Sequence, residues 1–197
     1  MATAWKPQNQ DLSDLPPVAQ LASDDVILWN YVAGSALYSY GFFGKALGER
    51  KISPTYVPRP FVLSYFDTLY LLEHGIIRLV DDNGKLLSAE EFREFAKDRY
   101  EDFETKYYFY RILRKKQYVP RPGMKFGSDF IVYSKGPGLE HSEWVFHVEK
   151  ENTQIRAIHV VRAGRLAASV RKKYMIAVKD EKNEGNPKFY MFERIKI

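Results

Sequence analysis

Residues 125–133 read KFGSDFIVY, and two shorter blocks follow them, EHS at 140–142 and SVRKK at 169–173. A tyrosine, a histidine and a lysine stand out in these three blocks, within a basic and aromatic-rich region. Apolar residues dominate 126–133 and 142–149, which predicts two strands joined by a loop containing Gly and Pro. Any function that this chain carries is therefore expected to depend on this part of the sequence.

The residues around these blocks predict one small mixed α/β domain. A basic amphipathic helix is expected over 155–173, and strands are expected at 174–178 and 189–197. The resulting order is β-β-α-β-β. The segment VPRPG at 119–123 cannot be helical and marks the expected start of this domain.

Residues 23–118 predict a separate N-terminal domain. Ser64 can cap a helix that Gly75 ends, and Ser88 with Glu91 forms a capping box. The aromatic stripe that follows steps by three and four, which predicts one long helix, or two with a break near Phe103, burying that stripe in a core. The remaining expected elements are strands at 24–29 and 76–80, a helical segment at 31–43 and a basic loop at 45–60. Prolines and polar residues in 1–22 predict a flexible tail, so the expected fold class is α+β with two mixed domains, 23–118 and 119–197.

The charge and the cysteine content narrow the possible functions. The 197-residue chain has a net charge of +5, but residues 105–175 alone hold 15 Lys and Arg against 5 Asp and Glu. This excess favours a polyanionic partner, although a solvated basic face would also explain it. The absence of cysteine excludes disulfides and thiolate catalysis, and it fits either a reducing cytoplasm or a hot-adapted chain. No apolar run approaches the roughly 18 residues of a membrane span, so a cytoplasmic location is expected.

The reactive residues suit RNA cleavage without a metal. The four histidines lack the carboxylate pattern of a metal site, so no cofactor is expected. RNA supplies its own nucleophile, the 2′-OH, and needs a base, an acid and a positive charge at the phosphorane. Tyr133, His141 and Lys172 could fill these roles, yet each could equally be a packed or solvated residue.

The three blocks resemble the signature blocks of the archaeal tRNA-splicing endonucleases, and the similarity extends to YLLEHG at 70–75 and YYFYRILR at 107–114. The resemblance implies that the C-terminal domain is the nuclease. It implies Tyr133 as general base, His141 as general acid and Lys172 as transition-state stabiliser. It also implies two arginines that sandwich a flipped base, Arg165 and Arg194.

Members of this family cut precursor tRNA at bulge-helix-bulge sites and leave a 2′,3′-cyclic phosphate and a 5′-OH. The resemblance implies a tetramer, either an α2β2 assembly with a structural paralogous subunit, which the long 45–60 loop favours, or a homotetramer. An acidic loop would dock into a neighbouring subunit, and the terminal strand would pair about a two-fold axis. The residues implied for this loop are Asp180, Glu181 and Glu184, and those implied for RNA contact in the 45–60 loop are Lys45, Arg50 and Lys51. A non-catalytic subunit on the same fold is the alternative, although such a paralogue would be expected to lose part of the triad.

Overall fold

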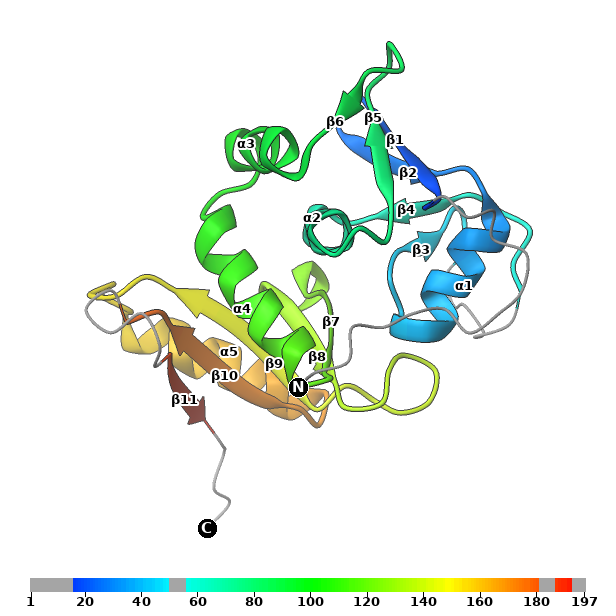
Figure 1. Cartoon of the computed structure of the whole chain (residues 1–197). Coiled ribbons are helices and arrows are strands. Elements are labelled where there is room, and N and C mark those ends of the chain that lie inside the picture. The colour runs from blue at the N-terminus through cyan, green and yellow to red at the C-terminus, as the bar shows by residue number, and fades with distance from the viewer. Residues whose placement is uncertain (1–15, 50–55, 181–186, 193–197) are drawn as a thin grey trace. The chain divides into compact units, whose positions relative to one another are not determined.

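The computed structural model describes residues 16–49, 56–180 and 187–192. The chain divides into two compact units, with the division after Glu101. Each unit contains one mixed sheet with helices, which confirms the α+β class (Figure 1).

The first unit is built on a six-stranded sheet in the order β3-β4-β2-β1-β5-β6. Its elements are β1 (Val18–Ala22), β2 (Asp25–Leu28), α1 (Tyr31–Gly41), β3 (Lys45–Ala46), β4 (Phe61–Leu63), α2 (Tyr65–Glu73), β5 (Arg78–Val80), β6 (Leu86–Leu87) and α3 (Ala89–Arg99). Phe61, Leu69 and Leu79 are fully buried in its core. None of the three sequence blocks lies in this unit.

Local capping explains where the helices of the first unit begin. The Ser64 hydroxyl accepts the N–H of Asp67, and Ser88 and Glu91 form the reciprocal capping box. Both predictions are thus confirmed. Asn30 caps α1 by accepting from the backbone of Val32 and Ala33.

The prediction of a tail over 1–22 is wrong for its last five residues. Val18–Ala22 form β1, which pairs with β2 on one side and with β5 on the other. Ala19 is fully buried and Leu21 nearly so. Pro16 and Pro17 argued against a strand here, but pairing with β5, which is distant in the sequence, stabilises β1. Residues 1–15 lie outside the described part of the chain.

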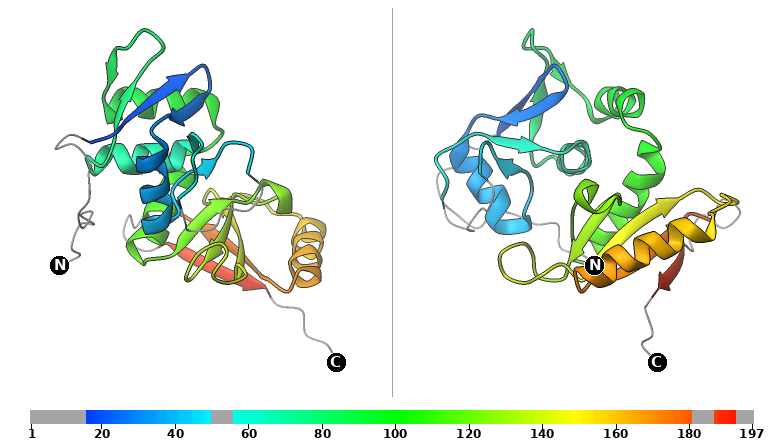
Figure 2. Two further views of the ribbon diagram at one scale, coloured as in Figure 1. Left: turned by 90° about the vertical axis from the view of Figure 1, so that its right-hand side faces the viewer. Right: turned by 180° about the vertical axis from the view of Figure 1, so that it is seen from behind.

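The second unit contains the five-stranded sheet β11-β10-β9-β8-β7. Its elements are α4 (Phe103–Lys115), β7 (Val119–Pro122), the 3₁₀ helix η1 (Met124–Phe126), β8 (Phe130–Tyr133), β9 (Trp144–Glu149), α5 (Ala157–Ser169), β10 (Lys173–Val178) and β11 (Lys188–Phe192). Among the described strands of this sheet, β9 and β10 alone run parallel, and α5 is the crossover between them. Figures 1 and 2 show α4 and α5 on opposite faces of this sheet.

Helix α4 explains why the division after Glu101 differs from the predicted boundary at 118/119. The helical stripe breaks at Asp102, which adopts the left-handed conformation with φ of 56°. Beyond the break, the Phe109 ring lies 6.1 Å from that of Phe146, and the Tyr110 ring lies 6.1 Å from that of Phe130. The stripe is buried as predicted, but its α4 half packs on the second sheet.

Strand β7 was not predicted, because Pro120 and Pro122 argue against a strand within a sheet. The strand lies at the edge of the sheet and pairs with β8 alone. A proline is tolerated there because its missing N–H can face away from the neighbouring strand. The other edge, β11, is exposed along its whole length.

Candidate active site

Three strand ends meet at one end of the second sheet. Tyr133 ends β8, and Lys172 directly precedes β10. Because β8 runs antiparallel to β9, and β9 parallel to β10, the end of β8 and the starts of β9 and β10 coincide. His141 lies in the loop that enters β9. We call this region the triad end, formed by Tyr133, His141 and Lys172.

The backbone register supports this placement. Val132 is opposite Trp144, and Trp144 is opposite Lys173. The N–H of Glu143 donates to the Val132 carbonyl at 3.0 Å, and the N–H of Lys173 donates to the Glu143 carbonyl at 2.9 Å. The segment that carries His141 is therefore bonded to both neighbouring strands.

Lys172 reaches across this end toward the histidine segment. Its Nζ donates to the carbonyl oxygen of Ser142, the residue after His141, at 2.9 Å. Nζ also lies 5.9 Å from the centre of the Phe126 ring. Partial burial lowers the pKa of Lys172. Among the described residues, no carboxylate lies within ion-pair distance of this ammonium, so its charge is available to a ligand.

The end of α5 sets the direction of Lys172. The Lys172 N–H donates to the Ala167 carbonyl at 2.8 Å, and the Arg171 N–H donates to the Ala168 carbonyl at 3.1 Å. This pair of bonds is the Schellman motif, whose left-handed position is usually glycine. Arg171 occupies that position with φ of 56°. The chain thereby turns from α5 into β10 within three residues.

His141 and Tyr133 differ in exposure. The His141 side chain is exposed, and Tyr133 is half-buried at the end of its strand. Ser142, between His141 and the β9 strand, is buried. An exposed imidazole can meet a large ligand, whereas the tyrosine is partly shielded.

The other predicted residues lie on other elements of the chain. Arg165 is exposed on α5, about two helical turns before Lys172, and Lys45 is exposed in β3 of the first unit. Asp180 lies beyond β10, and its carboxylate is 3.2 Å from Lys188 Nζ. The remaining predicted residues lie outside the described part of the chain: Arg50, Lys51, Glu181, Glu184 and Arg194.

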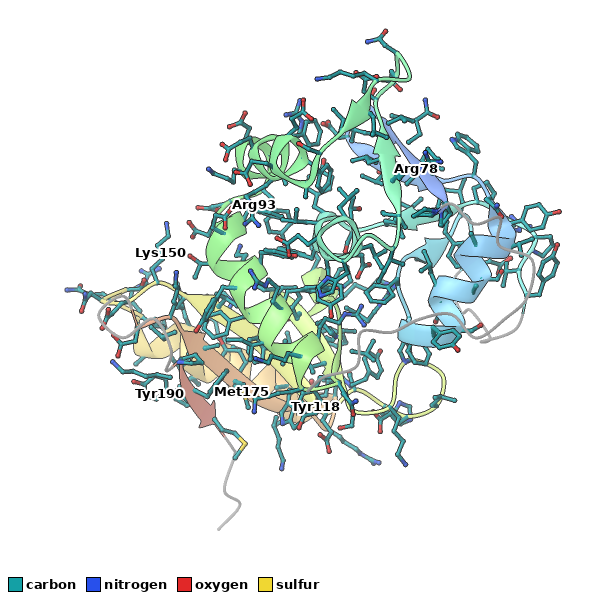
Figure 3. The ribbon with its side chains drawn as sticks, in the orientation of Figure 1. Arg78, Arg93, Tyr118, Lys150, Met175 and Tyr190 are labelled. Carbon is teal, nitrogen blue, oxygen red and sulfur yellow. The ribbon has the colours of Figure 1, made fainter. Side chains whose placement is uncertain are left out.

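A second cluster of charged residues lies at the opposite end of the same sheet, and sequence reasoning missed it. Asp129 Oδ1 lies 3.0 Å from Lys106 Nζ, and Oδ2 accepts the Val148 N–H at 2.8 Å. His147 bridges two carboxylates, with Nδ1 3.2 Å from Asp129 Oδ2 and Nε2 2.9 Å from Glu149 Oε1. We call this region the paired-charge end. The labelled Tyr118 and Lys150 mark the two ends in Figure 3, since Tyr118 packs on Trp144 at the start of β9 and Lys150 follows its last residue.

The electrostatics of this cluster follow from its contacts. Burial acts to raise the pKa of Asp129, but the contacts with His147, the Val148 N–H and Lys106 outweigh it, and the pKa is lowered. The contact with Asp129, close but poorly aligned for a hydrogen bond, raises the pKa of His147 against the effect of burial. The hint in the sequence was an aspartate directly before the apolar residues 130–132.

The described residues contain no group of three His, Cys, Asp or Glu side chains arranged to hold a metal ion. Nor does any helix within the described ranges combine the length and apolar character needed to cross a membrane.

Comparison with known proteins gives the family. Residues 103–186 match the catalytic C-terminal domain of tRNA intron endonucleases, and residues 18–93 match the N-terminal domain. The chain is 41% identical over 152 residues to a tRNA-splicing endonuclease of Hyperthermus butylicus, which covers 77% of this chain and 84% of that protein. It is 34% identical over 180 residues to one of Saccharolobus islandicus, covering 91% and 98% of the two chains. The chain thus belongs to the tRNA-splicing endonuclease family, with an N-terminal domain and a catalytic C-terminal domain.

Proposed function

We propose that this chain is the catalytic subunit of an endonuclease that removes introns from precursor tRNA by cutting bulge-helix-bulge sites. The observation that carries the proposal is the meeting of Tyr133, His141 and Lys172 at one end of the catalytic-domain sheet. These residues come from three separate blocks of the sequence. A non-catalytic subunit would have no need to keep all three at one place.

The proposed reaction is an attack by the 2′-OH on the adjacent phosphorus. Tyr133 takes the proton of the 2′-OH, and the 2′-oxygen forms a bond to phosphorus. The bond from phosphorus to the 5′-oxygen then breaks, and His141 gives a proton to that leaving oxygen. The products are a 2′,3′-cyclic phosphate and a 5′-OH, and no cofactor takes part.

Lys172 is proposed to stabilise the negative charge of the phosphorane. A preorganised cation is effective where charge develops, because it needs no rearrangement during the reaction. Nζ is held by a neutral carbonyl oxygen at 2.9 Å. That contact fixes the position of the ammonium without neutralising its charge.

RNA binding is proposed to use further cations. Arg165 and Arg194 would stack on a flipped bulge base, and Lys45, Arg50 or Lys51 would contact the RNA backbone. Arg165 and Lys45 are exposed, as such contacts require. With no cysteine in the chain, the cytoplasm remains the proposed location.

The proposed assembly is an α2β2 heterotetramer with a structural paralogous subunit, and a homotetramer is the alternative. Strand β11 supports an interface of this kind, because both of its faces are exposed and apolar, with Phe189, Tyr190, Met191 and Phe192 at 36–53% exposure. An exposed apolar edge strand is a template for pairing with another chain. The loop with Asp180, Glu181 and Glu184 is proposed to dock into a neighbouring subunit.

The test is single-turnover cleavage of a bulge-helix-bulge RNA in EDTA, alone and with a candidate partner subunit. The wild type should cut at both bulges. His141→Ala should lose about 10²- to 10⁴-fold in rate, the usual worth of one proton-transfer group. His159→Ala is the matched control, because His159 is an exposed histidine on α5 of the same unit. Failure to cut in every combination would favour the non-catalytic subunit, and loss of activity in EDTA alone would contradict the mechanism.

A further inference from the structure

The loop that joins β8 to β9 connects the proposed base to the proposed acid. It leaves Tyr133, turns through 134–139 and returns at Glu140 and His141. Gly136 and Gly138 have φ of 124° and 87°, a region of the backbone that favours glycine. The N–H groups of Leu139 and Glu140 both donate to the Gly136 carbonyl at 3.3 Å. The loop is therefore a closed turn with its own hydrogen bonds.

The Glu140 side chain bends back to the start of this loop. The N–H of Lys135 donates to Glu140 Oε1 at 2.5 Å. This bond is the main cause that lowers the pKa of the Glu140 carboxyl. The carboxylate of Glu140, adjacent to His141, is thus hydrogen-bonded to the backbone two residues after Tyr133.

The other side of His141 is held by different contacts. The Ser142 carbonyl accepts from Lys172 Nζ, and the Glu143 carboxylate accepts from the Ser134 hydroxyl at 3.2 Å. These contacts tie the C-terminal side of His141 to β8 and to the lysine. The tie between the N-terminal side of His141 and the chain leaving Tyr133 is made by Glu140.

We propose that Glu140 is a positioning residue, whose carboxylate, by accepting the Lys135 N–H, fixes His141 relative to Tyr133. This inference rests on the proposed function, because it assigns roles to both residues. Glu140 itself touches no reacting atom in this scheme. It acts by holding the acid and the base in a geometry in which both reach one phosphate.

A carboxylate suits this position better than an amide. Because it is charged, it accepts the Lys135 N–H more strongly than a neutral amide oxygen would. A glutamine has the same size, but only one of its two terminal atoms accepts. The Glu140→Gln change therefore keeps the volume and the reach of the side chain while it removes half of the acceptors.

The experiment compares Glu140→Gln with Lys135→Ala in single-turnover cleavage. Glu140→Gln should lower the rate at saturating RNA by about tenfold to a hundredfold, the cost expected of a misplacement near 1 Å, with little change in the RNA concentration needed for half-saturation. Lys135→Ala removes a charge from the same loop but keeps the backbone N–H. It should leave the saturated rate unchanged. An equal saturated rate for Glu140→Gln and wild type would overturn the inference.

A second readout does not depend on activity. In the wild type, the Lys135 amide proton should exchange slowly, and its chemical shift should follow the titration of Glu140 at acid pH. Both signatures should disappear in Glu140→Gln. If the exchange rate and chemical shift of the Lys135 amide do not depend on Glu140, the positioning inference is overturned even if the enzyme cleaves RNA. A wild type that cuts no RNA would overturn the proposed function instead.

Discussion

The two ends of the second sheet each hold a lysine and a histidine, but their neighbours differ. At the triad end, Lys172 donates to a carbonyl oxygen and its pKa is lowered by burial. At the paired-charge end, Lys106 faces the Asp129 carboxylate, and the pKa of His147 is raised by its anionic partners. The charge of a lysine is therefore compensated by a carboxylate at one end and left without a carboxylate partner at the other.

This difference separates a structural role from a chemical one. Breaking the buried ion pairs between α4, β8 and β9 should be destabilising, because removing one partner leaves the other charge uncompensated. A cation without a carboxylate partner costs some stability but can bind an anion. If the triad end acts on RNA and the paired-charge end stabilises the fold, substitutions at the triad end should lower the cleavage rate. Substitutions at the paired-charge end should instead lower the free energy of unfolding.

The largest effect is expected for Lys172→Ala. The rate of cleavage should fall by about 10²- to 10³-fold, the usual cost of removing one donor to a developing oxyanion. The free energy of unfolding should change little, because Nζ makes one hydrogen bond, to the Ser142 carbonyl, and no ion pair with a described residue. Single-turnover cleavage and urea denaturation of the same sample measure the two quantities. A large loss of stability with a normal rate would reverse the assignment of the two ends.

Asp129→Asn should do the opposite. It removes the charge that compensates Lys106 and His147, and it should cost about 3 kcal/mol of unfolding free energy, the low end of the range for breaking a buried ion pair. The cleavage rate per folded molecule should stay close to that of the wild type. Urea denaturation and an active-site titration test this prediction, which fails if stability is unchanged.

The pH dependence of stability should show the contribution of protonated His147. Its folded-state pKa lies above the reference value of 6.5, so its protonated form adds stability below pH 6.5, and this contribution is lost as the pH rises through the folded-state value. Asp129 and Glu149 face its ring, with Lys106 behind Asp129. The pKa of Asp129 is lowered, so it stays ionised throughout this window. His147→Gln should flatten the decline in denaturation midpoint between pH 6 and higher values, and an unchanged slope would contradict this account.

The smallest effect is expected for Arg171→Gly. A non-glycine residue in the left-handed region is strained, and glycine is not. Glycine relieves this strain but loses more conformational entropy on folding, so the net effect should be a rise in the unfolding free energy of about 0.5 kcal/mol. Lys173→Gly is the control, because Lys173 begins β10 with ordinary strand geometry, and there glycine should destabilise. Destabilisation by Arg171→Gly would mean that the arginine side chain makes a contact that outweighs the strain.

Local sequence signals predicted much of the fold. Caps at Ser64 and Ser88 depend on residues within one turn, so the sequence alone locates them. Strand β1 was missed because it is stabilised by pairing with β5, which is distant in the sequence. Strand β7 was missed because its two prolines argued against a strand, although it pairs with the neighbouring β8. The periodicity of α4 predicted a buried stripe, but it could not indicate which sheet would cover it.

The candidate site was also predicted only in part. The candidate residues Tyr133, His141 and Lys172 were found from the sequence blocks and the family resemblance. The bond from Lys172 to Ser142 and the cluster around Asp129 join residues that are far apart in the chain. Such contacts follow from strand register, which a single sequence does not specify. The structure therefore adds which charges are compensated, and this is what distinguishes the two ends.

The most direct test of the central claim is cleavage in EDTA of a bulge-helix-bulge RNA that carries a single 2′-deoxy residue on the 5′ side of one cut. The claim is that the triad end activates the RNA's own 2′-OH. The deoxy site should remain uncut while the unmodified bulge is cut to a 2′,3′-cyclic phosphate and a 5′-OH. Cleavage at the deoxy site, at a rate like that of the unmodified bulge, would contradict the claim.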